Sequence, residues 1–261
     1  MSTAADHRLP LVLLHAYPLD SRMWDDVRAA LSAEVRLITP DQRGLGTAPL
    51  AEEDAETPAP DLAVVAADVV ALLDRLGIER AIVGGASMGG YAAMALLRLA
   101  PERVAGLLLV DTKSEADQEA PRAARLDAAA RAETEGTADW IAAAMLPKLA
   151  AASTHQTRPA VVDRLRRLIE EQPAAGVAWA QRAMAVRPDS TAVLRDSGLP
   201  TLIVVGEQDE LSPPDGARRL VELLPHGRLE IVPDAGHLVP MEAPTAFLAA
   251  VLPWLAERRG R

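Results

Sequence analysis

The chain contains no cysteine, which excludes disulfide bonds and thiolate metal sites and removes any requirement for an oxidising compartment. Aromatic residues are also few, with four Trp, two Tyr and one Phe, so a ligand pocket would be lined mainly by Leu, Val, Ala and Met side chains. A net positive charge is missing too. The formal net charge of −10 disfavours nucleic acid and anionic membrane surfaces as partners.

Long apolar runs are missing as well. The first run, residues 9–14, is too short for the core of a secretory signal peptide and far too short to span a bilayer. We therefore expect a cytoplasmic protein that does not engage a membrane. Its 261 residues, 49% of them hydrophobic, can bury one sizeable core and fit a single α/β domain with an insertion.

Short apolar runs alternate with amphipathic stretches along most of the chain. Several of these runs, such as residues 104–110, have no polar interruption, which is typical of parallel strands that are covered on both faces. This alternation predicts one doubly wound parallel sheet with right-handed crossovers. We expect six strands, at residues 9–15, 35–38, 81–85, 104–110, 202–205 and 228–232.

The pattern changes between residues 113 and 196. No strand pattern appears there, Ala, Arg, Glu and Leu dominate, and five prolines divide the stretch. A structureless loop of this length is rare in a compact domain, so three or four helices are predicted. We interpret residues 113–196 as an inserted helical cap and residues 1–112 and 197–261 as the α/β core.

A G-x-S-x-G motif, Gly85 to Gly89, stands at the end of the third apolar run, and a helix-prone stretch follows it at once. A strand that turns sharply on a serine into a helix is a nucleophile elbow. We interpret Ser87 as the nucleophile, because the turn holds its hydroxyl clear of the sheet. The helix N-terminus behind it favours negative charge.

A serine hydroxyl is a weak nucleophile at neutral pH and needs a base, which in turn needs an orienting acid. His237 follows the last apolar run, and Asp209 follows the run before it. Asp111, directly after the run at 104–110, is an alternative acid. All of these residues stand beyond the carboxyl ends of predicted parallel strands, where open α/β sheets place their sites.

Five motifs in this order resemble the α/β-hydrolase family, and the resemblance covers nearly the whole chain. The pattern is most similar to that of small bacterial esterases and enol-lactonases with a helical cap. The motifs are His15-Ala16-Tyr17-Pro18, Asp41-x-Arg43-Gly44-x-Gly46, Gly85-x-Ser87-x-Gly89-Gly90, the turn that ends at Asp209, and the pair Gly236-His237.

The resemblance implies an α/β-hydrolase fold and a serine hydrolase that cleaves a small carboxylic ester or lactone. Ser87 would form the acyl-enzyme, His237 would relay the proton, and Asp209 would orient His237. The family's G-x-x-D turn favours Asp209 over Asp111 as the acid.

By the same resemblance, the oxyanion hole consists of the backbone N–H groups of Tyr17 and Met88, two fixed donors for the oxygen that gains charge. Two features depart from the family pattern. Ala16 stands where family members usually have Gly, which would shift the turn at Tyr17 slightly. Only eight residues precede Leu9, so the usual first hairpin is expected to be absent and all six strands to be parallel.

Specificity is expected to reside in the cap. The candidates for substrate contact are four cap residues and one residue beside the histidine, namely Trp140, Met145, Trp179, Met184 and Leu238. No His or carboxylate pair has metal-ligand spacing, so neither a metal nor another cofactor is expected. The same machinery also serves thioesters, amides and C–C bonds beside a ketone, and the fold also hosts lyases, cyclases and receptors.

Overall fold

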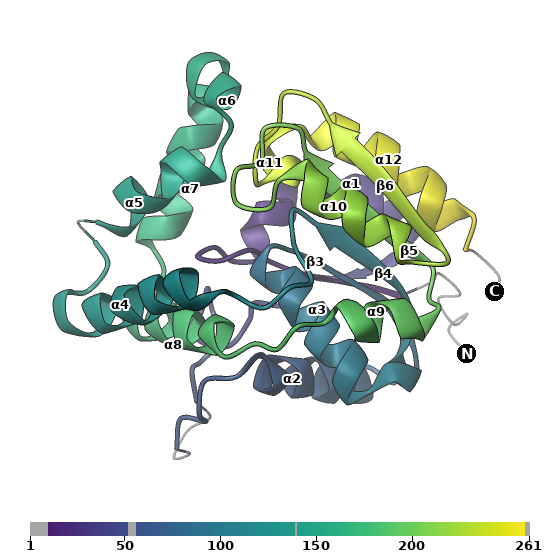
Figure 1. Cartoon of the computed structure of the whole chain (residues 1–261), viewed down its shortest axis with the longest axis horizontal. Helices are drawn as coiled ribbons and strands as arrows, with labels where there is room; N and C mark the ends of the chain where they lie inside the picture. The colour runs from purple at the N-terminus through teal and green to yellow at the C-terminus, as the bar shows by residue number, and fades with distance from the viewer. Residues whose placement is uncertain (1–9, 52–55, 139, 259–261) are drawn as a thin grey trace, which may run out of the picture.

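Six strands run through the centre of the computed structural model, which describes residues 10–51, 56–138 and 140–258 (Figure 1). In chain order they are β1 (Pro10–Leu14), β2 (Arg36–Ile38), β3 (Ala81–Ala86), β4 (Val104–Val110), β5 (Thr201–Gly206) and β6 (Gly227–Val232). They form one sheet in the order β2-β1-β3-β4-β5-β6, and every neighbouring pair is parallel. The prediction of six parallel strands is confirmed within these ranges. Residues 1–9, on which the expected absence of a first hairpin depends, lie outside them.

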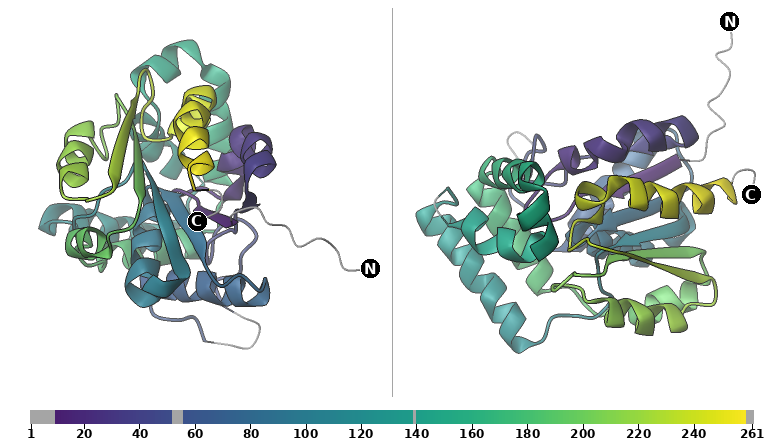
Figure 2. Two further views of the ribbon diagram at one scale, coloured as in Figure 1. Left: turned by 90° about the vertical axis from the view of Figure 1, so that its right-hand side faces the viewer. Right: turned by 90° about the horizontal axis from the view of Figure 1, so that it is seen from above.

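Helices cover both faces of the sheet (Figure 2). On one face lie α1 (Asp25–Glu34) and α12 (Pro244–Ala256), which pack on each other. On the other face lie α2 (Leu62–Arg75), α3 (Met88–Leu99), α9 (Thr191–Ser197) and α10 (Pro214–Glu222). Because both faces are covered, the central strands are largely apolar, and every residue of β3 and β5 is buried. Three short helices complete the core, namely η1 (Ser21–Trp24), η2 (Pro101–Arg103) and α11 (Val239–Glu242).

Helix α2 shows how the local sequence sets these elements. The side chain of Asp61 accepts the N–H of Ala63 at 2.8 Å and caps the first turn. Gly77, with φ +64°, follows the last turn in a left-handed conformation that favours glycine. Between them, apolar residues at helical spacing are buried against the core, namely Leu62, Val65, Ala66, Val69 and Leu73.

The strand order reverses direction at β1. The chain passes from β1 to β2 on one side of it and then places β3 on the other side. The connections therefore diverge at the carboxyl ends of β1 and β3, and such a switch point is where open α/β sheets bind ligands. Tyr17 and Ser87 stand just beyond these two strand ends.

Within the described ranges, the helices between β4 and α9 lie beyond the carboxyl edge of the sheet, on the left in Figure 1. They are α4 (Glu119–Glu135), α5 (Ile141–Leu149), α6 (Ala152–Thr157), α7 (Pro159–Glu170) and α8 (Ala174–Ala185). The prediction of three or four helices was therefore wrong. The short α6 has no apolar periodicity, and Pro147 lies inside the last turns of α5 instead of separating two helices. No helix in the described ranges has the length and apolar character needed to cross a membrane.

The chain enters and leaves this helical region at one place. The backbone N–H of Ser190 donates to the carbonyl of Ser114 at 2.9 Å, and the hydroxyls of Ser114 and Thr191 lie 2.8 Å apart. Helix α9 begins directly after this junction and packs on α3. The excursion away from the sheet therefore starts and ends at a single neck.

A pair of glycines lets helix α8 approach the loop after β2. Gly44 has φ +78°, and a Cβ atom on Gly176 would lie 1.7 Å from the carbonyl oxygen of Gly44. Beside this contact, the side chain of Gln172 accepts the N–H of Gly46 at 2.8 Å and donates to Asp20 at 2.9 Å. The two backbones therefore touch directly at this point.

The substitution Gly176→Ala should loosen this junction. The added methyl group would overlap the carbonyl of Gly44, so we expect a loss of about 1–3 kcal/mol in the free energy of unfolding, measured with a chemical denaturant. Gly216→Ala is the matched control, because a Cβ there would meet only the side chain of Arg219 at 3.8 Å. That control should gain up to about 1 kcal/mol from helix propensity. Equal stability of the two variants would show that the contact at Gly176 is not tight.

Candidate active site

Ser87 occupies a strained turn between β3 and α3. Its φ of +51° and ψ of −112° lie outside the regions that a non-glycine residue ordinarily adopts. The glycines two positions before and after Ser87 are required because a side chain would have no room there. A Cβ on Gly85 would lie 2.3 Å from the carbonyl carbon of Gly89. A Cβ on Gly89 would lie 2.0 Å from the carbonyl oxygen of Leu14. The sharp turn and the close approach to β1 therefore both depend on this sequence.

His237 lies between Ser87 and Asp209, although the three residues come from different strand ends. Its Nδ1 lies 2.9 and 2.8 Å from the two carboxylate oxygens of Asp209. Because an ionised carboxylate can only accept, Nδ1 carries the proton and Nε2 is left free to accept. The hydroxyl of Ser87 lies 2.8 Å from Nε2 and donates to it. Asp209 and His237 are buried, whereas Ser87 is partly exposed.

The surroundings of Asp209 keep its carboxyl group ionised. Burial raises the pKa of Asp209, but the charge and hydrogen bond of His237 lower it. The backbone N–H groups of Leu211 and Ser212 also donate to Oδ1, at 2.8 and 2.9 Å. The net effect is a pKa of Asp209 below its ordinary value.

Asp111 does not contact His237. Its two oxygens accept the backbone N–H groups of Gly206 and Val239, each at 2.9 Å. Burial, and then the nearby charge of Asp209, raise the pKa of Asp111 well above its ordinary value. Asp111 therefore ties together the ends of β4 and β5 and the start of α11. Of the two acids weighed from the sequence, Asp209 is the one within hydrogen-bonding distance of the imidazole.

The two backbone N–H groups expected to form the oxyanion hole come from adjoining segments. Met88 is the first residue of α3, and the next residue, Gly89, packs directly on the end of β1, from which the loop to Tyr17 departs. In the described part of the chain, no hydrogen-bond acceptor is paired with the N–H of Tyr17 or of Met88. Their role as oxyanion donors stays a prediction.

Buried polar contacts support the loop that carries Tyr17. The N–H of Gln42 donates to Nε2 of His15 at 2.8 Å, and the side-chain amide of Gln42 donates to the carbonyl of His15 at 2.7 Å. Burial lowers the pKa of His15, which keeps the ring neutral and able to accept. Ala16, which replaces the usual glycine, is not among the described residues with positive φ. Its methyl group therefore does not force a left-handed conformation here.

The five residues expected to contact substrate are mostly engaged elsewhere. Trp179 is buried, and its indole N–H donates to the carbonyl of Pro58 at 2.8 Å. Leu238 is fully buried beside His237, and Met145 is half-buried. The ring of Trp140 lies under the guanidinium of Arg131, 4.5 Å from it, and donates to the carbonyl of Gly136. Substrate contact by these residues stays a prediction.

A buried ion pair beside the helices α4 and α8 contacts the helix that follows Ser87. Arg187 forms two hydrogen bonds with Asp117, at 2.6 and 2.8 Å, and both side chains are almost completely buried. The guanidinium of Arg187 also lies 4.1 Å from the ring centre of Tyr91, one turn after Ser87 in α3. These residues were not predicted from the sequence, because isolated charged and aromatic residues form no recognisable sequence motif.

A second arginine extends this network toward the loop that carries Tyr17. Arg125 donates to Asp117 at 2.6 Å, to the side chain of Gln181 at 3.1 Å and to the sulfur of Met184 at 3.4 Å. The side chain of Gln181 lies close to the phenol of Tyr17, where it partly offsets the rise that burial causes in the pKa of Tyr17. Polar groups of α4 and α8 therefore extend toward the loop that carries one proposed oxyanion donor.

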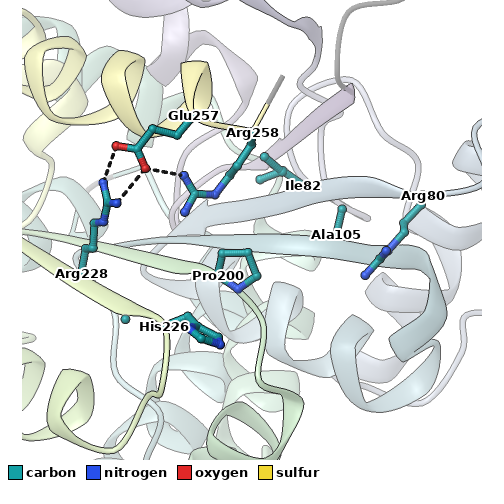
Figure 3. Close-up of a pocket in the computed structure, with 9 residues that line it drawn as sticks. Arg80, Ile82, Ala105, Pro200, His226, Arg228, Glu257 and Arg258 are labelled. Carbon is teal, nitrogen blue, oxygen red and sulfur yellow. Dashed lines mark hydrogen bonds and ion pairs between the residues drawn. The ribbon is translucent and has the colours of Figure 1, made fainter. Parts of the chain in front are cut away.

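A separate cavity of about 530 Å³ lies at the opposite edge of the sheet (Figure 3). Its lining includes Ile82, Ala105 and Arg228, which stand near the amino ends of β3, β4 and β6. Glu257 pairs with Arg228 at 2.7 Å and lies 3.6 Å from Arg258. The lining also includes Arg80, whose Nε donates to the carbonyl of Val104 at 3.0 Å, so the cavity carries more positive than negative charge. It lies far along the strands from Ser87.

Comparisons with known proteins match this arrangement. The model of the alpha/beta hydrolase fold family matches residues 10–244. A thermophilic esterase from Thermogutta terrifontis, solved with malate bound, is 38% identical with a TM-score of 0.90, over 96% of this chain and 90% of that chain. The "Putative non-heme bromoperoxidase BpoC" of Mycobacterium tuberculosis is 30% identical over 95% of this chain and 94% of its own length. The 3-oxoadipate enol-lactonase 1 of Acinetobacter baylyi is 27% identical over 91% of this chain and 85% of its own length.

Replacing each of the two acids by its amide should separate their roles. Asp209→Asn should slow the labelling of Ser87 by a small fluorophosphonate about ten-thousand-fold, because the amide favours the wrong imidazole tautomer. Asp111→Asn should instead lower the free energy of unfolding by about 1–3 kcal/mol, because its NH₂ group would face a backbone N–H. Labelling rates and denaturant curves measured on both variants check this assignment. It is wrong if Asp111→Asn abolishes labelling and Asp209→Asn does not.

Proposed function

The chain belongs to the alpha/beta hydrolase fold family, and from this membership we propose that it is a serine hydrolase of small carboxylic esters or lactones. The observation that carries the proposal is the unbroken line of hydrogen bonds from Asp209 through His237 to Ser87. A base that is oriented by a buried carboxylate and bonded to a serine hydroxyl is the arrangement that acyl transfer requires.

In the proposed reaction, Oγ of Ser87 attacks the substrate carbonyl carbon while its proton passes to Nε2 of His237. The C–O bond to the alcohol then breaks, and the imidazolium returns the proton to the departing alcohol oxygen. Water attacks the resulting acyl-enzyme, again losing a proton to His237. That proton passes to Oγ of Ser87 as the carboxylic acid leaves, which restores the enzyme.

Charge develops on the carbonyl oxygen in both steps of this reaction. The backbone N–H groups of Tyr17 and Met88 are the proposed donors to it, each worth about 3 kcal/mol of barrier. The negative charge of Asp209 stabilises the imidazolium that forms at the same moment. Both effects are strengthened when the cap excludes water from the site.

The substrate class rests on the relatives and on the size of the cap. One relative is named an enol-lactonase and another an esterase, and the same acyl-enzyme chemistry serves both. The region 113–196 is part of the proposal as a cap that sets specificity over a core of residues 1–112 and 197–261. The neck at Ser114 and Ser190 supports the start of this cap, whereas α9 packs on α3 of the core, which favours an end of the cap near residue 190.

A screen of hydrolysis tests the proposed reaction. We expect the wild-type chain to hydrolyse short-chain aryl esters and small lactones, and Ser87→Ala to lose this activity by at least about a thousand-fold. A fluorophosphonate should add one label, on the peptide that contains Ser87. Labelling that survives Ser87→Ala would contradict the assignment. Tight binding of a lactone without turnover would instead favour a receptor, and product formation without hydrolysis would favour a lyase or cyclase.

The cap is tested by a substitution within it. Met145→Ala should change the ranking of substrates by acyl length, because a smaller side chain in a pocket wall shifts such preferences by about 1–3 kcal/mol per methylene. Labelling of Ser87 by a methyl phosphonate should stay unchanged. Leu126→Ala, at an exposed cap position, is the control. A uniform loss on all substrates would mean that Met145 supports the fold and does not select substrate.

A further inference from the structure

Glu242 is a buried carboxylate that has no role in the proposed reaction. It ends the short helix α11 and is only 3% exposed. One of its oxygens, Oε1, accepts the backbone N–H of Gly236 at 3.0 Å and that of Leu238 at 3.1 Å. These two residues flank His237 in the chain. The carboxylate therefore holds the backbone on both sides of the imidazole.

The other oxygen of Glu242 binds the cap. Oε2 accepts the backbone N–H of Ala151 at 2.8 Å and the hydroxyl of Thr154 at 2.6 Å. Ala151 precedes α6, and Thr154 lies within it and is fully buried. One carboxylate thus receives four hydrogen bonds, two from the loop of His237 and two from the cap. A charged group can be buried in this way without a large energetic cost only when its hydrogen bonds are made.

Two further contacts place the cap directly on the histidine loop. A Cβ on Gly236 would lie 2.5 Å from the backbone nitrogen of Ala151, so the two backbones touch. Arg158, between α6 and α7, donates to Oγ1 of Thr154 at 2.6 Å and also to the backbone carbonyl of Glu242. The cap segment at 151–158 therefore meets the loop of His237 through one compact set of groups centred on Glu242.

We propose that Glu242 is a positioning residue that couples the seating of the cap to the placement of the His237 imidazole. The proposal rests on the proposed function, since it assigns His237 as the base. When the cap is seated, four donors satisfy the carboxylate and the loop is held in place. When α6 lifts away, Oε2 loses both of its partners, and the buried charge favours an opened histidine loop that admits water.

The consequence is that catalysis responds to whether the cap is closed. An open cap leaves His237 poorly aligned with Ser87, so the nucleophile is not activated while the site is open to solvent. A seated cap restores the alignment through Glu242. Glutamine cannot replace this residue, because its NH₂ group can only donate, and one of the two pairs of donors would lose its acceptor.

Three variants test the coupling. Glu242→Gln removes the double acceptor. Thr154→Val removes one cap donor to Oε2, together with the acceptor of one Arg158 hydrogen bond, and leaves the two N–H donors on the histidine side intact. Ser153→Ala is the matched control. Its hydroxyl also joins α6 to the core, lying 3.2 Å from Gln208 and 3.3 Å from the carbonyl of Asp234, but it bypasses Glu242.

The first readout is the low-field proton NMR signal of Nδ1–H of His237, which needs no turnover. We expect the exchange of this proton with water to speed up about ten- to a hundred-fold in Glu242→Gln, the size expected for losing hydrogen bonds to a charged group. Thr154→Val should speed it up less, and Ser153→Ala should not change it. The second readout is ester hydrolysis, in which kcat should fall in the same order while KM stays within a few-fold.

Several results would overturn the proposal. One is an unchanged proton signal and unchanged kcat in Glu242→Gln or Thr154→Val, even if the variant melts earlier, because the role would then be structural only. Another is an equal response in Ser153→Ala, because any loosening of the cap would then suffice. If Glu242→Gln does not fold, Thr154→Val alone decides. A wild-type chain that hydrolyses no ester would sink the proposed function, whereas the proton signal would still test the coupling.

Discussion

The imidazole of His237 is bonded at both nitrogens, and the rest of the structure serves to keep those two bonds in line. Its partners come from separate strands, with Ser87 after β3 and Asp209 after β5. A strained turn at Ser87 costs of order 1–3 kcal/mol, and it is held because Gly85 and Gly89 let the surrounding backbone close around it. The switch point between β1 and β3 brings the loop of Tyr17 to the same place. The geometry of the site is thus a consequence of the strand order.

Three buried carboxyl groups lie around the loop of His237, and each offsets the cost of burial in a different way. Asp209 stays ionised because His237 and two backbone N–H groups face it. Asp111 has a raised pKa, so the native state holds a proton that the unfolded chain gives up at lower pH. This site therefore costs stability increasingly as the pH rises from the ordinary aspartate pKa toward the raised value. Glu242 is satisfied by four donors. The ionised carboxylate of Asp209, next to the imidazole, thus lies near the carboxyl group of Asp111, which resists ionisation.

Much of this arrangement could be predicted from the sequence, and the parts that could not share a cause. The strands were predictable because a sheet covered on both faces needs unbroken apolar runs, and the range 104–110 agrees with β4 (Val104–Val110). The elbow was predictable because Gly85 and Gly89, two positions before and after Ser87, stand where a side chain has no room. Helix α6 was not, since its six residues carry no apolar period. The roles of Glu242 and Arg187 were also missed, because each depends on partners that are distant in the chain. Local pattern reveals elements and elbows, whereas buried polar networks appear only once the chain is folded.

The central claim is that Ser87 attacks a carbonyl whose oxygen is received by the N–H groups of Tyr17 and Met88. The most direct measurement is a crystal structure of the chain after reaction with a methyl phosphonate, which mimics the tetrahedral intermediate. The account predicts a phosphorus atom bonded to Oγ of Ser87, with the phosphonyl oxygen about 2.7–3.1 Å from both nitrogens. An oxygen that remains on phosphorus should lie beside Nε2 of His237, where the alcohol oxygen of a substrate would depart. An adduct on another residue, or a phosphonyl oxygen turned away from Tyr17 and Met88, would contradict it.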